Sequence, residues 1–320
     1  MQIADVKEKW TNRINTVTLG ATPAEGGTRA RTVTVGGETT LPFLTFEGEI
    51  PNPPAIAGLI ADVVPEDWPD ALKNAIGKEI ASPAEWAQKC VRDWKADLVC
   101  LKLLGVDPLG KNLSADHAAK TVKAVLQAVD VPLIVWGCGD LQKDNEVLPQ
   151  VSQAARGENC LLGPATDKNY RTLAAVGKAD KHKLIGEAPV DINIAKQINI
   201  LLQDAGYDIK DVVMCQVTAA LGYGFDYVYT IFERVRTAGL KGDKHMALPQ
   251  LANVGWETWK VKEALADDDA LPGWGKLEKR GPAWEASAAA GYIQAGADIV
   301  TLAHPESIAI TKETISELMK

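Results

Sequence analysis

The sequence predicts an α/β fold, a closed (β/α)8 barrel of parallel strands with an N-terminal β-hairpin appendage. Eight short apolar runs recur after residue 54 without polar alternation, as expected for parallel strands that are buried on both faces. Amphipathic stretches of helical periodicity separate these runs. An open, doubly wound sheet is the main alternative, but such sheets usually carry a glycine-rich turn after the first strand, and residues 62–66 contain no glycine.

The expected strands are spread evenly over the chain. They occupy residues 55–64, 97–104, 132–136, 159–163, 183–186, 211–215, 247–253 and 298–302. Before them, residues 15–19 and 31–35 are rich in threonine and valine around a Pro/Gly loop, which predicts the hairpin. Strand-like residues continue to position 49, ahead of three closely spaced prolines. We therefore expect an N-terminal β appendage over residues 1–50 and a barrel over residues 51–320.

Helix boundaries are marked by capping residues. Ser82, Ser114 and Asp191 each precede an amphipathic stretch and are typical N-caps, and Gly206 is typical of the position after a helix end. One unit is long, because a helix-like stretch over 256–266 leads into an Asp-rich and Pro/Gly-rich loop before the next helix near residue 283.

Composition excludes several classes of protein. The chain has 320 residues, 46% of them hydrophobic, and a formal net charge of −8, which argues against binding to nucleic acid or to an anionic membrane surface. No apolar run reaches the ~18 residues of a membrane span. The first ten residues are too polar for a signal peptide, so we expect a cytoplasmic protein with reduced cysteines.

Few residues offer catalytic or metal chemistry. The five cysteines lie tens of residues apart, a spacing that excludes a sequential iron–sulfur or zinc motif. Cys138, at a strand end, is the one cysteine placed to meet a ligand, and a structural role is favoured even there. His304 follows the last strand and either faces the barrel mouth or caps a helix. We expect no catalytic residue and no metal site in this chain.

Function on such a barrel belongs to the carboxyl ends of the strands. These ends are expected at residues 105–107, 137–140, 163–166, 187–189, 216–224, 253–256 and 303–305. They are rich in glycine and alanine and poor in convergent acids and bases, unlike the sites of hydrolases or metal enzymes. We expect a smooth mouth that covers a large flat ligand, or a docking surface without chemistry of its own.

Five segments at and near these strand ends carry a family resemblance. They are Val-Met-Cys-Gln-Val-Thr-Ala-Ala-Leu-Gly-Tyr-Gly (213–224), Pro-Leu-Ile-Val-Trp-Gly-Cys-Gly (132–139), Asn-Cys-Leu-Leu-Gly-Pro-Ala (159–165), Pro-Pro-Ala-Ile-Ala-Gly (53–58) and Asp-Ile-Asn-Ile-Ala-Lys-Gln (191–197). In their order along the chain and in its total length, they resemble the small subunit of the corrinoid/iron–sulfur protein of acetogenic bacteria, akin to the delta subunit of acetyl-CoA decarbonylase/synthase.

The resemblance implies a TIM barrel that forms a heterodimer with a larger subunit. That subunit would carry the [4Fe–4S] cluster and a corrinoid domain, with the cobamide between this domain and the barrel mouth. The cobalt would take a methyl group from methyltetrahydrofolate through a separate methyltransferase and pass it to acetyl-CoA synthase, in the reductive acetyl-CoA (Wood–Ljungdahl) pathway of carbon fixation. The chain would thus be a methyl-carrier subunit rather than a self-sufficient enzyme.

The resemblance also points to the residues of the mouth. Small residues would permit close approach to the corrin, and hydroxyl and amide side chains would bind its amide rim. The expected cofactor-facing residues are Gly139, Thr166, Glu187, Thr218, Ala219, Leu221, Gly222, Tyr223, Asn253 and Gly255.

Two other functions stay open. The first is a pterin-binding methyltransferase acting directly on methyltetrahydrofolate, in which Asp107, Asp140 and Asn193 would hold the pterin. The second is a silent scaffold that contacts only other proteins.

Tryptophan is concentrated in one segment. Four of the nine tryptophans, Trp256, Trp259, Trp274 and Trp284, lie within 29 residues. Packing of outer helices on the strands accounts for Trp284 and Trp259. Tryptophan is favoured at the centres of protein interfaces, so we expect Trp256 or Trp274 to be exposed in the isolated chain and covered by the large subunit or the cobamide.

Overall fold

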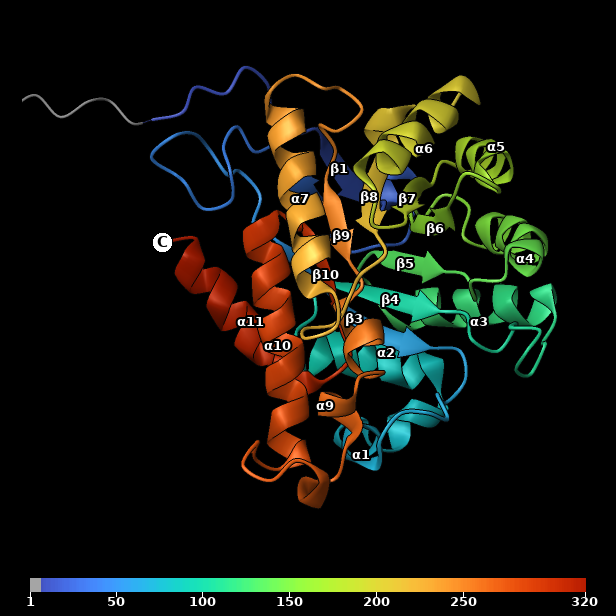
Figure 1. The fold of residues 1–320 in the computed structure, drawn as a ribbon. Coiled ribbons are helices and arrows are strands. Elements are labelled where there is room, and N and C mark those ends of the chain that lie inside the picture. The colour runs from blue at the N-terminus through green and yellow to red at the C-terminus, as the bar shows by residue number, and fades with distance from the viewer. Residues whose placement is uncertain (1–6) are drawn as a thin grey trace, which may run out of the picture.

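The computed structural model describes residues 7–320. Eight parallel strands close into a barrel in the order β10-β3-β4-β5-β6-β7-β8-β9, which confirms the predicted fold class (Figure 1). The strands are β3 (Ala55–Ala61), β4 (Leu98–Lys102), β5 (Leu133–Trp136), β6 (Leu161–Ala165), β7 (Lys183–Ala188), β8 (Val212–Gln216), β9 (Gln250–Ala252) and β10 (Ile299–Leu302). Each lies within or next to one of the eight predicted runs.

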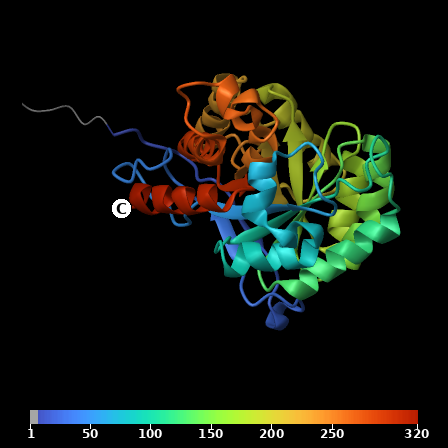
Figure 2. The same ribbon diagram turned by 90° about the horizontal axis from the view of Figure 1, so that it is seen from below.

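The helices surround this ring of strands (Figures 1 and 2). They are α1 (Asp70–Ile76), α2 (Pro83–Arg92), α3 (Ala115–Ala128), α4 (Leu141–Ala154), α5 (Tyr170–Asp180), α6 (Ile192–Asp204), α7 (Phe225–Leu240), α8 (Val254–Thr258), α9 (Lys262–Leu265), α10 (Leu277–Ala295) and α11 (Pro305–Leu318). Sequential helices pack side by side, α2 on α3, α3 on α4 and α10 on α11 among them. They cover the outer faces of the strands, which are therefore buried on both sides.

The predicted helix boundaries hold at three places. The side chains of Ser82, Ser114 and Asp191 accept hydrogen bonds from backbone N–H groups in the first turns of α2, α3 and α6. The helix expected over 256–266 is wrong in detail, since α8 and α9 are two short helices separated by a turn. The next helix, α10, begins at Leu277, ahead of the expected start near residue 283.

The hairpin of β1 (Thr16–Leu19) and β2 (Val33–Gly36) lies across the amino ends of the barrel strands. Asn159, just ahead of β6, donates from Nδ2 to the carbonyls of Thr18 (3.0 Å) and Gly20 (2.9 Å). The buried Arg29 guanidinium donates to three carbonyls, that of Leu126 in the last turn of α3 and those of Val129 and Val131 between α3 and β5. The hairpin therefore closes the end of the barrel opposite to the candidate site.

Residues 37–49 form turns, so the expected continuation of strand structure to residue 49 is wrong. Gly36 and Gly37 adopt φ angles of +82° and +94°, a left-handed conformation that ends β2. A buried ion-pair triad then ties this segment to the barrel, because Arg236 on α7 binds Glu38 (2.6 Å) and Asp298 (2.8 Å).

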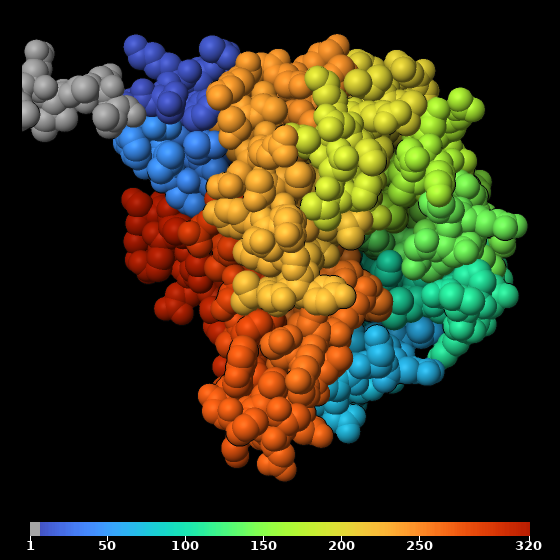
Figure 3. Space-filling view, in the orientation of Figure 1, coloured from blue at the N-terminus to red at the C-terminus, as the bar shows by residue number. Residues whose placement is uncertain are grey.

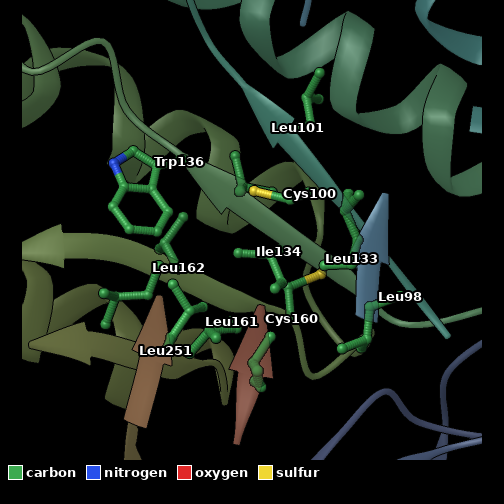
Figure 4. Packing of buried hydrophobic residues seen from close by; sticks show 14 of the residues in the cluster. Leu98, Cys100, Leu101, Leu133, Ile134, Trp136, Cys160, Leu161, Leu162 and Leu251 are labelled. Atoms are coloured by element: carbon green, nitrogen blue, oxygen red, sulfur yellow. The ribbon is translucent and has the colours of Figure 1, made fainter. Parts of the chain in front are cut away.

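The barrel interior is filled with side chains. Successive residues of a strand point to opposite faces, and residues paired in register share a face. The pairing of Cys100 with Ile134 and of Lys102 with Trp136 therefore places all four side chains on the inner face of β4 and β5. Figure 4 shows the apolar part of this packing. At the carboxyl end, the apolar layers give way to Lys102 and its neighbours.

Candidate functional site

Lys102 is the most unusual residue of the barrel mouth. It ends β4, only 6% of its surface is exposed, and among residues 7–320 it forms neither a hydrogen bond nor an ion pair. Its Nζ lies 5.9 Å from the centroid of the Trp136 ring and 5.7 Å from that of Trp256. Burial lowers its pKa, while the carboxylates of Asp144 and Glu187 act in the opposite direction. The ammonium thus makes cation–π contacts with two indole rings and has no hydrogen-bond acceptor.

Two carboxylates approach this lysine from the neighbouring elements. Glu187, near the end of β7, pairs in register with Cys215 on the inner face, and burial raises its pKa to about 6. Asp144, in the first turn of α4, accepts backbone N–H bonds from Cys138 (2.8 Å) and Gly139 (3.0 Å), and burial raises its pKa. The expectation of a mouth poor in convergent acids and bases is therefore wrong.

The reason for that error lies in the position of the residues. Lys102 is the last residue of an otherwise apolar strand, and Asp144 lies within a helix, so neither was among the expected strand ends. The available signal was the lysine itself, flanked by Leu101 and Leu103 in a run whose other members are buried. A cation in such a run is uncommon unless it faces a partner or a ligand.

Three polar side chains form the opposite inner wall. Thr218 accepts at Oγ1 from the Asn253 backbone N–H (2.8 Å) and donates to the Gln216 carbonyl (3.3 Å). Thr301 donates from Oγ1 to Asn253 Oδ1 (2.7 Å). The Asn253 amide Nδ2 has no hydrogen-bond partner within residues 7–320. Two expected site residues, Thr218 and Asn253, thus lie together and keep one free donor.

The loop between β8 and α7 forms an exposed rim. Tyr292 on α10 holds its base, because its hydroxyl accepts from Ala219 N (3.1 Å) and donates to Ala219 O (2.6 Å). Trp284 donates from Nε1 to the Leu221 carbonyl (3.0 Å). At the tip, Gly222 has a φ of +82° and Tyr223 is 79% exposed. Of the four expected residues of this loop, Gly222 and Tyr223 are therefore exposed, whereas Ala219 and Leu221 are half-buried against the core.

The remaining expected residues have local structural roles. Gly255 is buried, and a Cβ there would lie 2.8 Å from the Ala303 backbone nitrogen, so close packing of α8 on β10 requires glycine. Thr166 donates to Asn169 Oδ1 (3.2 Å) ahead of α5. Gly139 has a φ of +104° with open space where a side chain would be.

Exposed apolar side chains gather around the mouth. Nine large apolar side chains of residues 7–320 are exposed, and seven of them lie in the connections that follow barrel strands or in the first turn of the next helix. These seven are Val64, Leu109, Val190, Val217, Tyr223, Tyr227 and Trp274. We call them the apolar rim. Apolar side chains clustered on one face indicate an interaction surface.

The tryptophans of the Trp-rich segment differ in exposure, and the difference agrees in part with the prediction. Trp259 is buried in the core and donates to Glu285 (3.2 Å), whereas Trp274 is 51% exposed and its ring lies 5.6 Å from that of Trp284. The predicted exposure of Trp274 is confirmed, and Trp256 is half-buried against Lys102. Figure 3 shows the orange segment between α9 and α10 projecting at the lower edge of the molecule.

Other candidate chemistry is absent from the described residues. Burial and the Asp144 carboxylate raise the pKa of Cys138 to about 12, so this thiol is not activated. His304 caps α11 by accepting from Glu306 N (3.1 Å), which settles its alternatives in favour of capping. Within residues 7–320, no cluster of His, Cys, Asp or Glu is arranged to hold a metal ion. No helix there combines the length and apolarity of a membrane span.

A surface hollow of about 940 Å³ lies far from the mouth. It is at the hairpin end, where α2 and α3 meet the chain around Arg29 and Glu158. Its buried cation is already paired, since Arg29 binds Glu158 (2.8 Å). We therefore place the candidate site at the carboxyl end of the strands.

The fold and site define a parallel (β/α)8 barrel whose mouth carries polar side chains inside an apolar rim. Among solved structures, the same fold occurs in dihydropteroate synthase from Coxiella burnetii, with a TM-score of 0.55 and 13% identity over 85% of this chain and 94% of that one. The enzyme from Thermus thermophilus gives 0.53 and 13%, over 83% and 94%. At these identities, the likeness concerns the fold alone.

The chain belongs to the CO dehydrogenase/acetyl-CoA synthase delta subunit family, whose model matches residues 16–312. It is 39% identical to the acetyl-CoA decarbonylase/synthase complex subunit delta of Archaeoglobus fulgidus, over 98% of this chain and 70% of that protein. It is 37% identical to subunit delta 1 of Methanosarcina thermophila, over 99% and 73%. The predicted family is confirmed.

Proposed function

We propose that the chain is the small subunit of a heterodimeric corrinoid/iron–sulfur methyl carrier and that its barrel mouth covers the cobamide. The observation that carries the proposal is the apolar rim, which concentrates seven of the nine exposed large apolar side chains at one end of the barrel. A large subunit bearing the [4Fe–4S] cluster and a corrinoid domain would dock there. Acetyl-CoA decarbonylase/synthase is the complex named for the relatives, and it supplies the setting for this role.

The residues of the mouth fit a corrinoid. Its rim consists of carboxamide side chains, which need both donors and acceptors, and the unpaired Lys102, Glu187 and Asn253 Nδ2 offer both. A bound corrinoid would supply a cobalt that accepts and donates a methyl group. The chain's own residues would orient the macrocycle and exclude water from one of its faces. They would take no part in proton transfer.

In this proposal the chain acts with three partners. The large subunit shares the cobamide, a methyltetrahydrofolate methyltransferase delivers the methyl group, and acetyl-CoA synthase receives it in the reductive acetyl-CoA pathway. Because the cobamide would meet the methyltransferase and acetyl-CoA synthase in turn, the cover over the mouth would have to open and close.

The pterin-binding alternative is less well supported. Asp107 accepts from Leu109 N (2.8 Å) in a loop turn, and Asp140 accepts from Lys143 N (2.8 Å) as the N-cap of α4. Asn193 is exposed in the first turn of α6. The three residues that would hold a pterin are therefore spread over the surface instead of converging in the mouth.

Co-purification tests the proposal. The chain is expressed with and without a corrinoid-bearing large subunit, in cells supplied with cobalamin, and complexes are separated by size. We expect a heterodimer with about one corrinoid, and a colourless isolated chain. Methyltetrahydrofolate bound by the isolated chain in equilibrium dialysis would support the methyltransferase instead. A heterodimer whose assembly is indifferent to corrinoid would support the scaffold.

A further inference from the structure

Lys102 is a buried cation and Glu187 a half-buried acid, and the two do not pair with each other. Only 6% of the Lys102 surface is exposed. Neither Lys102 nor Glu187 forms a side-chain hydrogen bond or an ion pair within residues 7–320. Both side chains lie on the inner face near the carboxyl ends of their strands, because Lys102 pairs in register with Trp136 and Glu187 with Cys215. Buried polar groups in folded proteins are almost always hydrogen-bonded, so the unpaired Lys102, with an unpaired acid on the same inner face, is a sign of a ligand.

The neighbouring charges are already satisfied. Lys260, whose Nζ lies 5.1 Å from the Trp256 ring centroid, pairs with Glu257 (2.9 Å). Asp144 accepts two backbone N–H groups and the Cys138 thiol. The charged groups of the mouth that remain unpaired here are therefore one ammonium and one carboxyl, with no net charge between them.

This balance selects the chemistry of the ligand. A phosphate or carboxylate would meet Glu187 as a like charge, and an ammonium would meet Lys102 in the same way. A neutral group with a carbonyl oxygen beside an N–H satisfies both side chains at once. The rings of Trp136 and Trp256, on either side of the lysine, suit the flat body of an amide.

We propose that Lys102 and Glu187 form a subsite for one carboxamide side chain of the corrin, with the lysine donating to its carbonyl and Glu187 accepting from its NH2. The identity of the ligand rests on the proposed function. The subsite anchors the macrocycle against rotation over the mouth, because it fixes one point of the amide rim inside the barrel.

The test compares two corrinoids on the reconstituted heterodimer. Dicyanocobinamide keeps the side-chain amides, whereas the heptamethyl ester of cobyrinic acid replaces them with esters that have no N–H. Binding is measured by equilibrium dialysis from corrin absorbance. For the wild type, we expect cobinamide to bind at least ~10-fold more tightly than the ester, as befits hydrogen bonds to charged groups.

The variants assign the effect to the two side chains. Lys102→Met and Glu187→Met are expected to weaken cobinamide binding at least ~10-fold and to reduce the preference over the ester, whereas Glu187→Gln keeps an acceptor and much of the preference. Lys260→Met is the matched control, since it removes the second cation on Trp256 and is expected to bind as the wild type does. Should a single variant fail to fold, the double variant Lys102→Met/Glu187→Met removes both charges together.

The outcomes separate the two proposals. Wild-type affinity and preference in both methionine variants would overturn the subsite and leave the proposed function standing. A wild-type heterodimer that binds neither corrinoid would overturn the proposed function and the subsite with it. Binding of tetrahydrofolate that is lost in the double variant would assign the same amide chemistry to a pterin edge and contradict the corrin assignment.

Discussion

Lys102 Nζ lies 5.7 Å from the centroid of the Trp256 ring, a contact between the end of β4 and the helix α8 that follows β9. These elements lie on different sides of the barrel mouth, since β4 and β9 are separated in the ring by β3 and β10. Trp256 also packs against Trp68, with ring centroids 6.2 Å apart. The half-buried indole thus lies beside both Lys102 and Trp68, so α8 contributes to the surroundings of the lysine.

Trp274→Ala is expected to weaken assembly with the large subunit and leave the isolated chain as stable as before. Its ring is half-exposed in the apolar rim, so truncation removes interface area instead of core packing. We expect at least a ~10-fold loss of affinity in isothermal titration and a change in unfolding free energy within about 0.5 kcal/mol. An unchanged affinity would remove this segment from the interface.

Trp259→Ala is the counterpart of Trp274→Ala in the core, and it is expected to lower the stability of the isolated chain. This indole is 1% exposed and donates to Glu285, a fully buried carboxyl that also accepts from Ala303 N and His304 N. Truncation leaves a cavity and takes away one of three donors, so urea unfolding is expected to show a loss of about 3–5 kcal/mol. A loss below 1 kcal/mol would contradict the packing of α10 described above.

Glu187→Gln is expected to make the chain more stable than the wild type, and the gain is expected to be larger at neutral pH than at acid pH. Burial raises the folded pKa of Glu187 from 4.5 to about 6, so the folded state binds the proton more tightly than the unfolded state. Below pH 4.5 both states are protonated and the group contributes nothing, whereas between pH 4.5 and 6 wild-type stability falls as the unfolded state ionises first.

Thermal unfolding over this range provides the measurement. The difference in Tm between Glu187→Gln and the wild type is expected to increase from pH 4.5 to pH 7, by an amount that corresponds to about 2 kcal/mol at most. Lys102 lowers the pKa of this carboxyl, whereas Glu257 and Asp144 raise it together with burial, and all four influences are absent in the glutamine variant. A constant or decreasing difference would contradict the raised pKa of Glu187.

Arg236→Met is expected to destabilise the chain by about 3–5 kcal/mol. The substitution leaves Glu38 and Asp298 buried without the cation that binds both, and an unpaired buried charge is costly. The control is Lys279→Met, which removes an exposed pair with Glu306 and is expected to cost less than about 1 kcal/mol in urea unfolding. Equal effects of the two variants would mean that the triad does not anchor residues 37–49.

The barrel could be predicted from the sequence because its signals are local. Apolar runs without alternation mark strands buried on both faces, and Ser82, Ser114 and Asp191 mark helix starts through hydrogen bonds to the next turn. The failures involve backbone geometry and distant contacts. Gly36 and Gly37 end β2, and the capacity of residues 37–49 to stay irregular depends on Arg236, some 200 positions away.

The site could be predicted only in outline. The loops that follow the strands are where the sequence places them, and Glu187, Thr218 and Asn253 do lie in the mouth. The grouping of these side chains depends on the closure of the ring, which brings Lys102 from β4 into one mouth with residues of β7 and α8. Gly255 shows a second limit of prediction from the sequence. A small residue after a strand serves close packing as readily as ligand binding, and the sequence does not distinguish the two roles.

Protection of the apolar rim tests the central claim most directly. Leu109→Cys places a thiol at a position that is 98% exposed beside the mouth, and Ile310→Cys places one on α11, away from it. Maleimide labelling of each variant is followed with and without the corrinoid-loaded large subunit. We predict that the partner slows labelling at position 109 at least ~10-fold and leaves position 310 unchanged. Equal labelling of position 109 in the assembled complex would contradict a partner docked over the barrel mouth.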